Sequence, residues 1–198
     1  MTLDETLQLA ADFQSQTNPM ELLELYNGVL KTPKGAVVEV GSASGGTTIA
    51  LISAAEQVGK MVYSVDPYPE ELEGVADHFP VGLMAELKEK FSQNILNGRW
   101  KNIRQFNVDV KKCGWTFPKL SVVFIDGLHE LQCVKDGFEV LFPKLVPGGR
   151  MYIHDTNWKV GQLSKTFEGA VCHATKLMTE DKFTDIRLIS SMLCGTKI

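Results

Sequence analysis

Short apolar runs alternate with segments of helical periodicity along most of the chain, and this alternation restricts the fold more than any other feature of the sequence. Strands that are apolar throughout are typical of a parallel sheet covered by helices on both faces. We expect strands at 36–40, 61–65, 103–108, 122–125 and 150–154, and helices at 47–57, 83–96, 130–142 and 160–176. The predicted fold class is therefore α/β, a doubly wound and mostly parallel sheet.

Two amphipathic helices precede this pattern, and the second has a clear start signal. Asn18 is a helix cap, Pro19 fits the first turn, and Glu21 completes a capping box. Two short strands at 183–188 and 191–198 are too close for a crossover helix, which predicts a closing antiparallel hairpin. A chain of 198 residues fits a single domain, with N-terminal helices in 1–32 and the core in 33–198. The N-terminal helices could cover the sheet or form a dimer contact, so monomer and homo-oligomer both stay open.

Charge and composition exclude several function classes. The net charge of −4 and the lack of a basic stripe argue against a nucleic-acid partner. No apolar run approaches the ~20 residues needed to span a bilayer, so no membrane role is expected. The acidic N-terminus does not resemble a signal peptide, which predicts a cytoplasmic protein. The cysteines are far apart and are expected to be free thiols: Cys113, Cys133, Cys172 and Cys194.

A glycine-rich segment at 41–46 joins the first strand to the following helix. In parallel sheets of this type, ligands bind beyond the carboxyl ends of the strands. The dinucleotide-binding fingerprint is only half met, because Ala43 stands between Gly41 and Gly46 where a second glycine is usual. A tight turn from strand to helix also needs glycine, so this segment alone leaves a structural role open.

Two acidic residues near this segment favour a ligand site. Glu39 interrupts an apolar strand, where an unpaired carboxylate is costly, so we expect it to accept hydrogen bonds from the loop or from a ligand ammonium group. Asp66 ends the second strand, where an acid binds ribose hydroxyls in nucleoside-binding sheets. The alternative for Asp66 is a turn-forming role before Pro67.

The sequence resembles the class I S-adenosylmethionine-dependent methyltransferases. The matching elements are VVEVGSASGGTT, VDPYP, the strand end Val108-Asp109, LSVVFIDGLHE, the turn at 146–150 and the closing hairpin. Together they cover about residues 30–198 in the expected order. The resemblance implies a Rossmann-like fold and S-adenosyl-L-methionine as the cofactor.

The resemblance also implies roles for individual residues around that cofactor. The loop glycines would pass beside its methionine half, Glu39 would organise the loop, Asp66 would hold the ribose, and Asp109 with Val110 would flank the adenine. The implied cofactor-binding set, with loop hydroxyls included, is Glu39, Gly41, Ser42, Ser44, Gly45, Thr47, Asp66, Asp109, Val110 and Asp126.

A second set of polar residues follows the fourth and fifth strands. Asp126 ends one strand, with His129 at the start of the next helix, and His154 and Asp155 end the other. Neighbouring parallel strands lie about 4.8 Å apart, so Asp126 and Asp155 could share a divalent cation. Carboxylate oxygens suit Mg²⁺, and Mn²⁺ or Ca²⁺ would also fit.

This pattern resembles the methyltransferase branch of macrocin-type sugar O-methyltransferases and of the proteins named for cephalosporin hydroxylase. The resemblance implies that Asp126 and Asp155 bind Mg²⁺, that Asp126 also takes part in catalysis, and that His129 is the general base. Members of this branch commonly have two adjacent acids at the second position, where this chain has His154. His154 could be a ligand or a packing residue, and Asn157 is a reserve ligand.

Residues 67–82 form a long connection rich in proline and acid, which we interpret as a lid over cofactor and acceptor. Its expected substrate contacts are Tyr68, His78 and Phe79, and Trp158 could line the same pocket. The alternative for this segment is an ordered surface loop without a catalytic part.

The function that these observations favour is metal-assisted O-methylation of a small hydroxylated molecule, a sugar or a natural product. A general base such as His129 would remove the hydroxyl proton, although a histidine there could also cap the helix. Two other functions stay open: an NAD-dependent oxidoreductase, and an adenosyl-cofactor-binding protein without catalysis.

Overall fold

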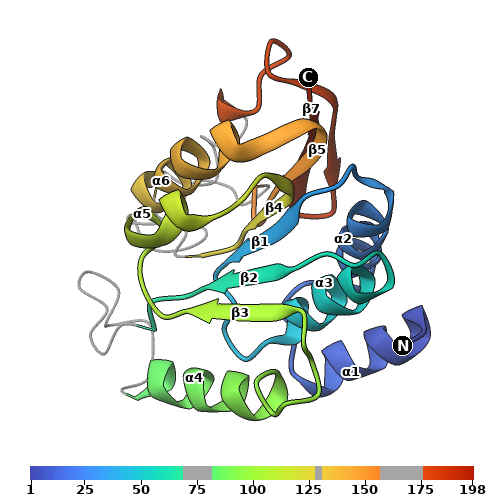
Figure 1. Cartoon of the computed structure of the whole chain (residues 1–198), viewed down its shortest axis with the longest axis vertical. Helices are drawn as coiled ribbons and strands as arrows, with labels where there is room; N and C mark the ends of the chain where they lie inside the picture. Colours follow the sequence, from blue (N-terminus) through green and yellow to red (C-terminus); the bar gives the residue numbers. More distant parts are fainter. Residues whose placement is uncertain (69–81, 128–130, 157–175) are drawn as a thin grey trace.

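The computed structural model describes residues 1–68, 82–127, 131–156 and 176–198. It contains a seven-stranded sheet with the strand order β3-β2-β1-β4-β5-β7-β6 (Figure 1). Strands β1 to β5 pair in parallel, and β7 pairs antiparallel with both β5 and β6. The strand bounds are β1 Ala36–Val40, β2 Val62–Val65, β3 Ile103–Phe106, β4 Leu120–Ile125, β5 Leu145–Ile153, β6 Phe183–Ile189 and β7 Met192–Lys197. The predicted fold class, including the closing hairpin, is confirmed.

Helices cover both faces of this sheet (Figure 1). Their bounds are α1 Leu3–Asp12, α2 Pro19–Lys31, α3 Gly46–Gln57, α4 Leu83–Asn94, α5 Val110–Cys113 and α6 Leu131–Leu141, with 3₁₀ turns η2 Gly114–Thr116 and η3 Phe142–Lys144. Side chains of α1, α2, α3 and α4 form one core cluster, and those of α5 and α6 form the other. The expected helix at 160–176 falls almost entirely outside the described residues.

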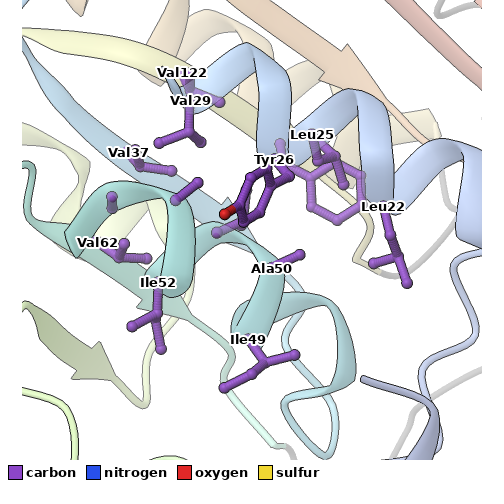
Figure 2. Packing of buried hydrophobic residues seen from close by; sticks show 14 of the residues in the cluster. Leu22, Leu25, Tyr26, Val29, Val37, Ile49, Ala50, Ile52, Val62 and Val122 are labelled. Atoms are coloured by element: carbon purple, nitrogen blue, oxygen red, sulfur yellow. The ribbon is translucent and has the colours of Figure 1, made fainter. Parts of the chain in front are cut away.

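Strand alternation explains why two cores form. In β1, Val37 packs into the cluster under α2 and α3, whereas Val38 packs into the cluster under α6. Figure 2 shows the first cluster, in which side chains of α2 and α3 meet those of three neighbouring strands. Continuous burial along β1 and β4 therefore reflects two covered faces, as the apolar runs predicted.

The second N-terminal helix covers the sheet, which answers one of the questions left open by the sequence. Tyr26 and Val29 of α2 are buried against the sheet and α3 (Figure 2). At Gly28, a Cβ atom would lie 2.0 Å from the Tyr152 hydroxyl oxygen, so only glycine permits this close approach. The predicted helix start is confirmed, because the Asn18 side chain accepts hydrogen bonds from the backbone N–H groups of Met20 and Glu21.

Two local features differ from the prediction. Strand β5 begins at Leu145 rather than at Arg150, and its register with β4 shifts between these two residues. Gly148, in the predicted turn, has φ +76°, so the turn becomes an irregularity inside the strand. The short helix α5 was not predicted; Asp109 caps it by accepting a hydrogen bond from the backbone N–H of Lys111 at 2.7 Å.

The structure also bears on the predictions about free cysteines and membrane-spanning helices. Cys113 and Cys194 are buried free thiols, as expected. In the part of the chain that the structure describes, no helix is both long and apolar enough to cross a membrane.

Candidate active site at the carboxyl edge of the sheet

The residues that directly follow β1, β4 and β5 still form the backbone hydrogen bonds of the sheet. This brings their side chains to the same edge of the sheet. The backbone N–H of Gly41 donates to Val65 O at 2.9 Å, that of Asp126 to Val40 O at 2.8 Å, and that of His154 to Ile125 O at 3.0 Å. Because side chains alternate along a strand, Asp126 and His154 face the side covered by α2 and α3. The sequence-predicted residues at these strand ends therefore share one region.

The loop between β1 and α3 owes its shape to left-handed backbone conformations. Gly41 and Gly45 have φ angles of +86° and +93°, and Ala43 has +44°. A Cβ atom at Gly41 would lie 2.1 Å from Asp126 O, and one at Gly45 would lie 2.5 Å from Ile95 Cγ1. Both glycines are therefore required by close approach of the chain to itself, in addition to any ligand.

Asp66, which directly follows β2, holds the loop between β1 and α3 by hydrogen bonds. Its Oδ2 accepts hydrogen bonds from the backbone N–H groups of Ser42 at 2.9 Å and Ala43 at 3.1 Å. Its Oδ1 accepts a third from the backbone N–H of Tyr68 at 3.0 Å. Burial raises the pKa of Asp66, and the three hydrogen bonds oppose that shift. A carboxylate has about four acceptor positions, so one position remains for a ligand hydroxyl.

Tyr68 lies beneath the loop rather than in an open lid. Its side chain is buried with φ +42°, and its hydroxyl donates to Ala43 O at 2.6 Å. The ring is near Phe91 of α4, with centroids 6.5 Å apart. Tyr68, a predicted substrate contact, thus holds the glycine loop in this structure. The other predicted lid contacts, His78 and Phe79, lie outside the described residues.

Glu39 is completely buried in β1 and is only half satisfied. Its Oε2 accepts a hydrogen bond from Thr48 Oγ1 at 2.6 Å, while Oε1 has no partner among the described residues. Burial raises the pKa of Glu39 to about 8, and the charges of Asp126 and Asp66 add to the shift. A carboxyl group in this state is neutral at pH 7 and ionises readily when a cation approaches it.

His154 lies at the centre of a carboxylate cluster. Its Nδ1 lies 3.1 Å from Asp126 Oδ1 and 3.4 Å from Asp155 Oδ1. Its Nε2 lies 3.1 Å from Oε2 of Glu21, which comes from α2. One ligand atom from each of Asp126, His154 and Asp155 can be chosen so that all three lie within 4.8 Å of one another. This is the set that the sequence predicted as metal ligands.

The charges in this cluster compensate one another. Burial by itself would lower the pKa of His154, but hydrogen bonds with Asp126, Asp155 and Glu21 outweigh it and raise the pKa to about 12. Burial would raise the pKa of Glu21, yet hydrogen bonds with His154 and Ser191 lower it to about 2. Without a metal ion, the imidazolium is therefore the cation that neutralises the neighbouring carboxylates.

Other predicted residues have partners within the protein. Thr47 Oγ1 lies 2.7 Å from Thr17 Oγ1, and Ser44 Oγ donates to Phe13 O at 2.7 Å, so these hydroxyls hold the connection between α1 and α2. Ser42 Oγ lies 3.3 Å from the Tyr68 hydroxyl. The side chain of Val110 is buried in the cluster under α6, next to the cap residue Asp109.

Glu21 was missed as a site residue. The sequence showed only its capping-box role, which the structure confirms through the hydrogen bond from the Asn18 backbone N–H to Glu21 Oε2 at 3.2 Å. Conversely, several predicted residues lie outside the described residues: His129, Asn157 and Trp158.

Comparison with solved structures places this fold in a known class. CalS11, a calicheamicin methyltransferase, has a TM-score of 0.61 at 15% identity, over 98% of this chain and 91% of that one. A protein from Corynebacterium glutamicum has a TM-score of 0.68 at 13% identity, over 98% and 88%. MycE, solved with Mg, SAH and mycinamycin VI, has a TM-score of 0.60 at 13% identity, over 97% of this chain and 54% of that one. The fold is that of the class I S-adenosylmethionine-dependent methyltransferases.

Comparison with family models leads to the same class. The model of a methyltransferase domain matches residues 38–156, which run from β1 past β5. The chain therefore belongs to this methyltransferase domain family, as its motifs predicted. A comparison with curated protein sequences gave no match.

Proposed function

We propose that the protein transfers a methyl group from S-adenosyl-L-methionine to a hydroxyl of a small molecule, a sugar or a natural product, with the help of a divalent metal ion. The observation that carries this proposal is the cluster of Asp126, His154 and Asp155 beside the glycine loop. Among structural neighbours, CalS11 is a TDP-rhamnose 3′-O-methyltransferase, and MycE was solved with mycinamycin VI. Both neighbours support a small hydroxylated acceptor.

The edge of the sheet fits a positively charged cofactor. The unpaired Oε1 of Glu39 is a buried acceptor that an ammonium group would satisfy, and Asp66 retains an acceptor position for a ribose hydroxyl. Asp109 and Val110, after β3, would lie beside the adenine. The cofactor would supply an electrophilic methyl group on a sulfonium centre. The loop at 41–46 would fix its position, because methyl transfer depends mainly on holding donor and acceptor in line.

The cluster of Asp126, His154 and Asp155 fits a divalent ion. Cis ligands held at about 2.1 Å from an octahedral ion lie about 3 Å apart, and Nδ1 of His154 is 3.1 Å from Asp126 Oδ1 and 3.4 Å from Asp155 Oδ1. Such an ion would act as a Lewis acid that lowers the pKa of the acceptor hydroxyl. His129 is the proposed base that takes the hydroxyl proton. Because an imidazole ligand suits Mn²⁺ or Zn²⁺ better than Mg²⁺, all three ions need to be tested.

Methyl transfer to simple sugar and phenolic alcohols, followed with radiolabelled S-adenosyl-L-methionine, tests this function. We expect transfer that depends on added Mg²⁺ or Mn²⁺, and a loss of about 100-fold or more in His129→Ala and Asp126→Asn. Undiminished transfer in chelator would refute the metal-assisted step. Undiminished transfer in His129→Ala would refute the assignment of the base.

A further inference from the structure

Behind His154, on the side away from Asp126, lies a buried carboxylate that the proposed reaction does not use. Glu21 is 1% exposed, and its Oε2 lies 3.1 Å from His154 Nε2. Its other oxygen, Oε1, accepts hydrogen bonds from the backbone N–H and the hydroxyl of Ser191, both at 2.8 Å. Glu21 thus connects α2, the end of β5 and the turn between β6 and β7.

The two ring nitrogens of His154 face different partners. Nδ1 faces Asp126 and Asp155, the proposed ligands, whereas Nε2 faces Glu21 and lies 3.2 Å from Ser191 Oγ, whose hydrogen is donated to Glu21 Oε1. An ionised carboxylate can only accept hydrogen bonds, so Nε2 must carry a hydrogen. In a neutral imidazole with its hydrogen on Nε2, the lone pair is on Nδ1 and points toward the two aspartates.

We propose that Glu21 is a positioning residue that selects this tautomer of His154 and so makes Nδ1 a metal ligand. This inference rests on the proposed metal site. Histidines that bind metals usually donate their other N–H to a carboxylate or carbonyl, and loss of that partner typically weakens metal binding 10–100-fold. From α2, Glu21 reaches this cluster through its hydrogen bonds with His154 and Ser191.

The attachment of α2 does not depend on Glu21 alone. One turn further along the helix, Glu24 Oε1 accepts hydrogen bonds from Arg150 Nη1 and Arg187 Nη2, both at 2.8 Å. The cap of α2 would also survive a change of Glu21 to Gln, because the Asn18 side chain still accepts hydrogen bonds from the backbone N–H groups of Met20 and Glu21; only the 3.2 Å bond from the Asn18 N–H to Oε2 is lost. Glu21→Gln is therefore a narrow change, and Glu24→Gln is a matched control that removes a charge from the same helix.

In Glu21→Gln the amide oxygen is needed by the backbone N–H of Ser191, so the NH₂ group must face His154 Nε2. This arrangement requires a lone pair on Nε2 and places the hydrogen on Nδ1, where it blocks the metal. We expect Mn²⁺ affinity, measured by electron paramagnetic resonance of the free ion, to fall at least 10-fold in Glu21→Gln. In Glu24→Gln it should stay within about twofold of the wild type.

A second readout reports the tautomer directly. In ¹⁵N-histidine spectra of the Zn²⁺-loaded wild type, we expect a metal-bound Nδ1 and a protonated Nε2 for His154. Unchanged Mn²⁺ affinity in Glu21→Gln, or a metal-bound Nε2, would overturn the role of Glu21 while leaving the metal site intact. If the wild type binds neither Mn²⁺ nor Zn²⁺, the metal site itself is wrong and the inference falls with it.

A folding defect would be recognised by thermal unfolding of each variant. If Glu21→Gln does not fold, Glu21→Asp takes its place, because the shorter side chain keeps the charge but moves the carboxylate away from Nε2. We expect a reduced Mn²⁺ affinity in Glu21→Asp as well, and wild-type affinity there would contradict the inference.

Discussion

Glu39 is a buried carboxyl group at which ligand binding and folding stability have opposite requirements. Burial raises its pKa to about 8, so the folded protein keeps a proton that the unfolded chain releases near 4.5, the ordinary pKa of a glutamate. An ammonium ligand instead requires the ionised form. Its Oε1, which has no partner among the described residues, therefore lowers stability at neutral pH, and the same oxygen is the acceptor proposed for a cationic ligand.

We expect Glu39→Gln to be more stable than the wild type at high pH and to bind S-adenosylhomocysteine more weakly. Between pH 4.5 and about 8 the folded wild type binds more protons than the unfolded chain, so its stability falls as pH rises. A glutamine at this position does not titrate, so it adds no such pH dependence to the folding stability. Urea unfolding at a series of pH values should show an advantage of the variant that grows to about 1 kcal/mol or more by pH 8.

The binding half of this prediction is measured by calorimetry, where we expect a loss of about 10-fold or more in Glu39→Gln. Stability curves that stay parallel across this pH range would contradict the raised pKa. Unchanged affinity for S-adenosylhomocysteine would remove Glu39 from the cofactor site.

At the scale of elements, the glycine loop and α4 depend on each other. Gly45 precedes α3 as its N-cap with φ +93°, and Ile95, directly after α4, occupies the space that its Cβ would need. Gly59, which follows α3, also has a positive φ of +67°, but nothing lies within 4 Å of its Cβ position. Alanine substitutions at Gly59 and Gly45 therefore separate two free-energy costs: that of the left-handed backbone conformation, present at both positions, and that of the steric overlap, present only at Gly45.

We expect Gly59→Ala to cost about 1 kcal/mol in the free energy of unfolding, because the left-handed conformation alone disfavours alanine. Gly45→Ala should cost about 3 kcal/mol, because overpacking against Ile95 is added. Denaturant unfolding of the two variants measures the difference. Equal losses would mean that α4 moves freely and does not brace the loop.

Local signals in the sequence predicted most elements, and long-range contacts account for what they missed. Asn18, Pro19 and Glu21 mark the start of α2 because a capping box is formed by neighbouring residues. The contact between Glu21 and His154 spans 133 positions and has no local signature. Likewise, Gly148 marked a turn, but only pairing with β4 decided that the strand continues through it.

At the scale of the whole molecule, the distribution of charge at the carboxyl edge distinguishes between cofactors. Among the residues that the structure describes, five acidic side chains face this region together with His154: Glu21, Glu39, Asp66, Asp126 and Asp155. The pyrophosphate of a nicotinamide dinucleotide would be repelled there, whereas an ammonium or sulfonium group is attracted. The incomplete glycine fingerprint and the charge distribution thus both favour the adenosyl cofactor.

The most direct test of the account is isothermal titration calorimetry of the wild-type protein with S-adenosylhomocysteine and, separately, with NAD. We expect saturable one-site binding of S-adenosylhomocysteine with a Kd in the micromolar range, about −8 kcal/mol, and no binding of NAD at the same concentrations. Saturable binding of NAD together with no binding of S-adenosylhomocysteine would contradict the account.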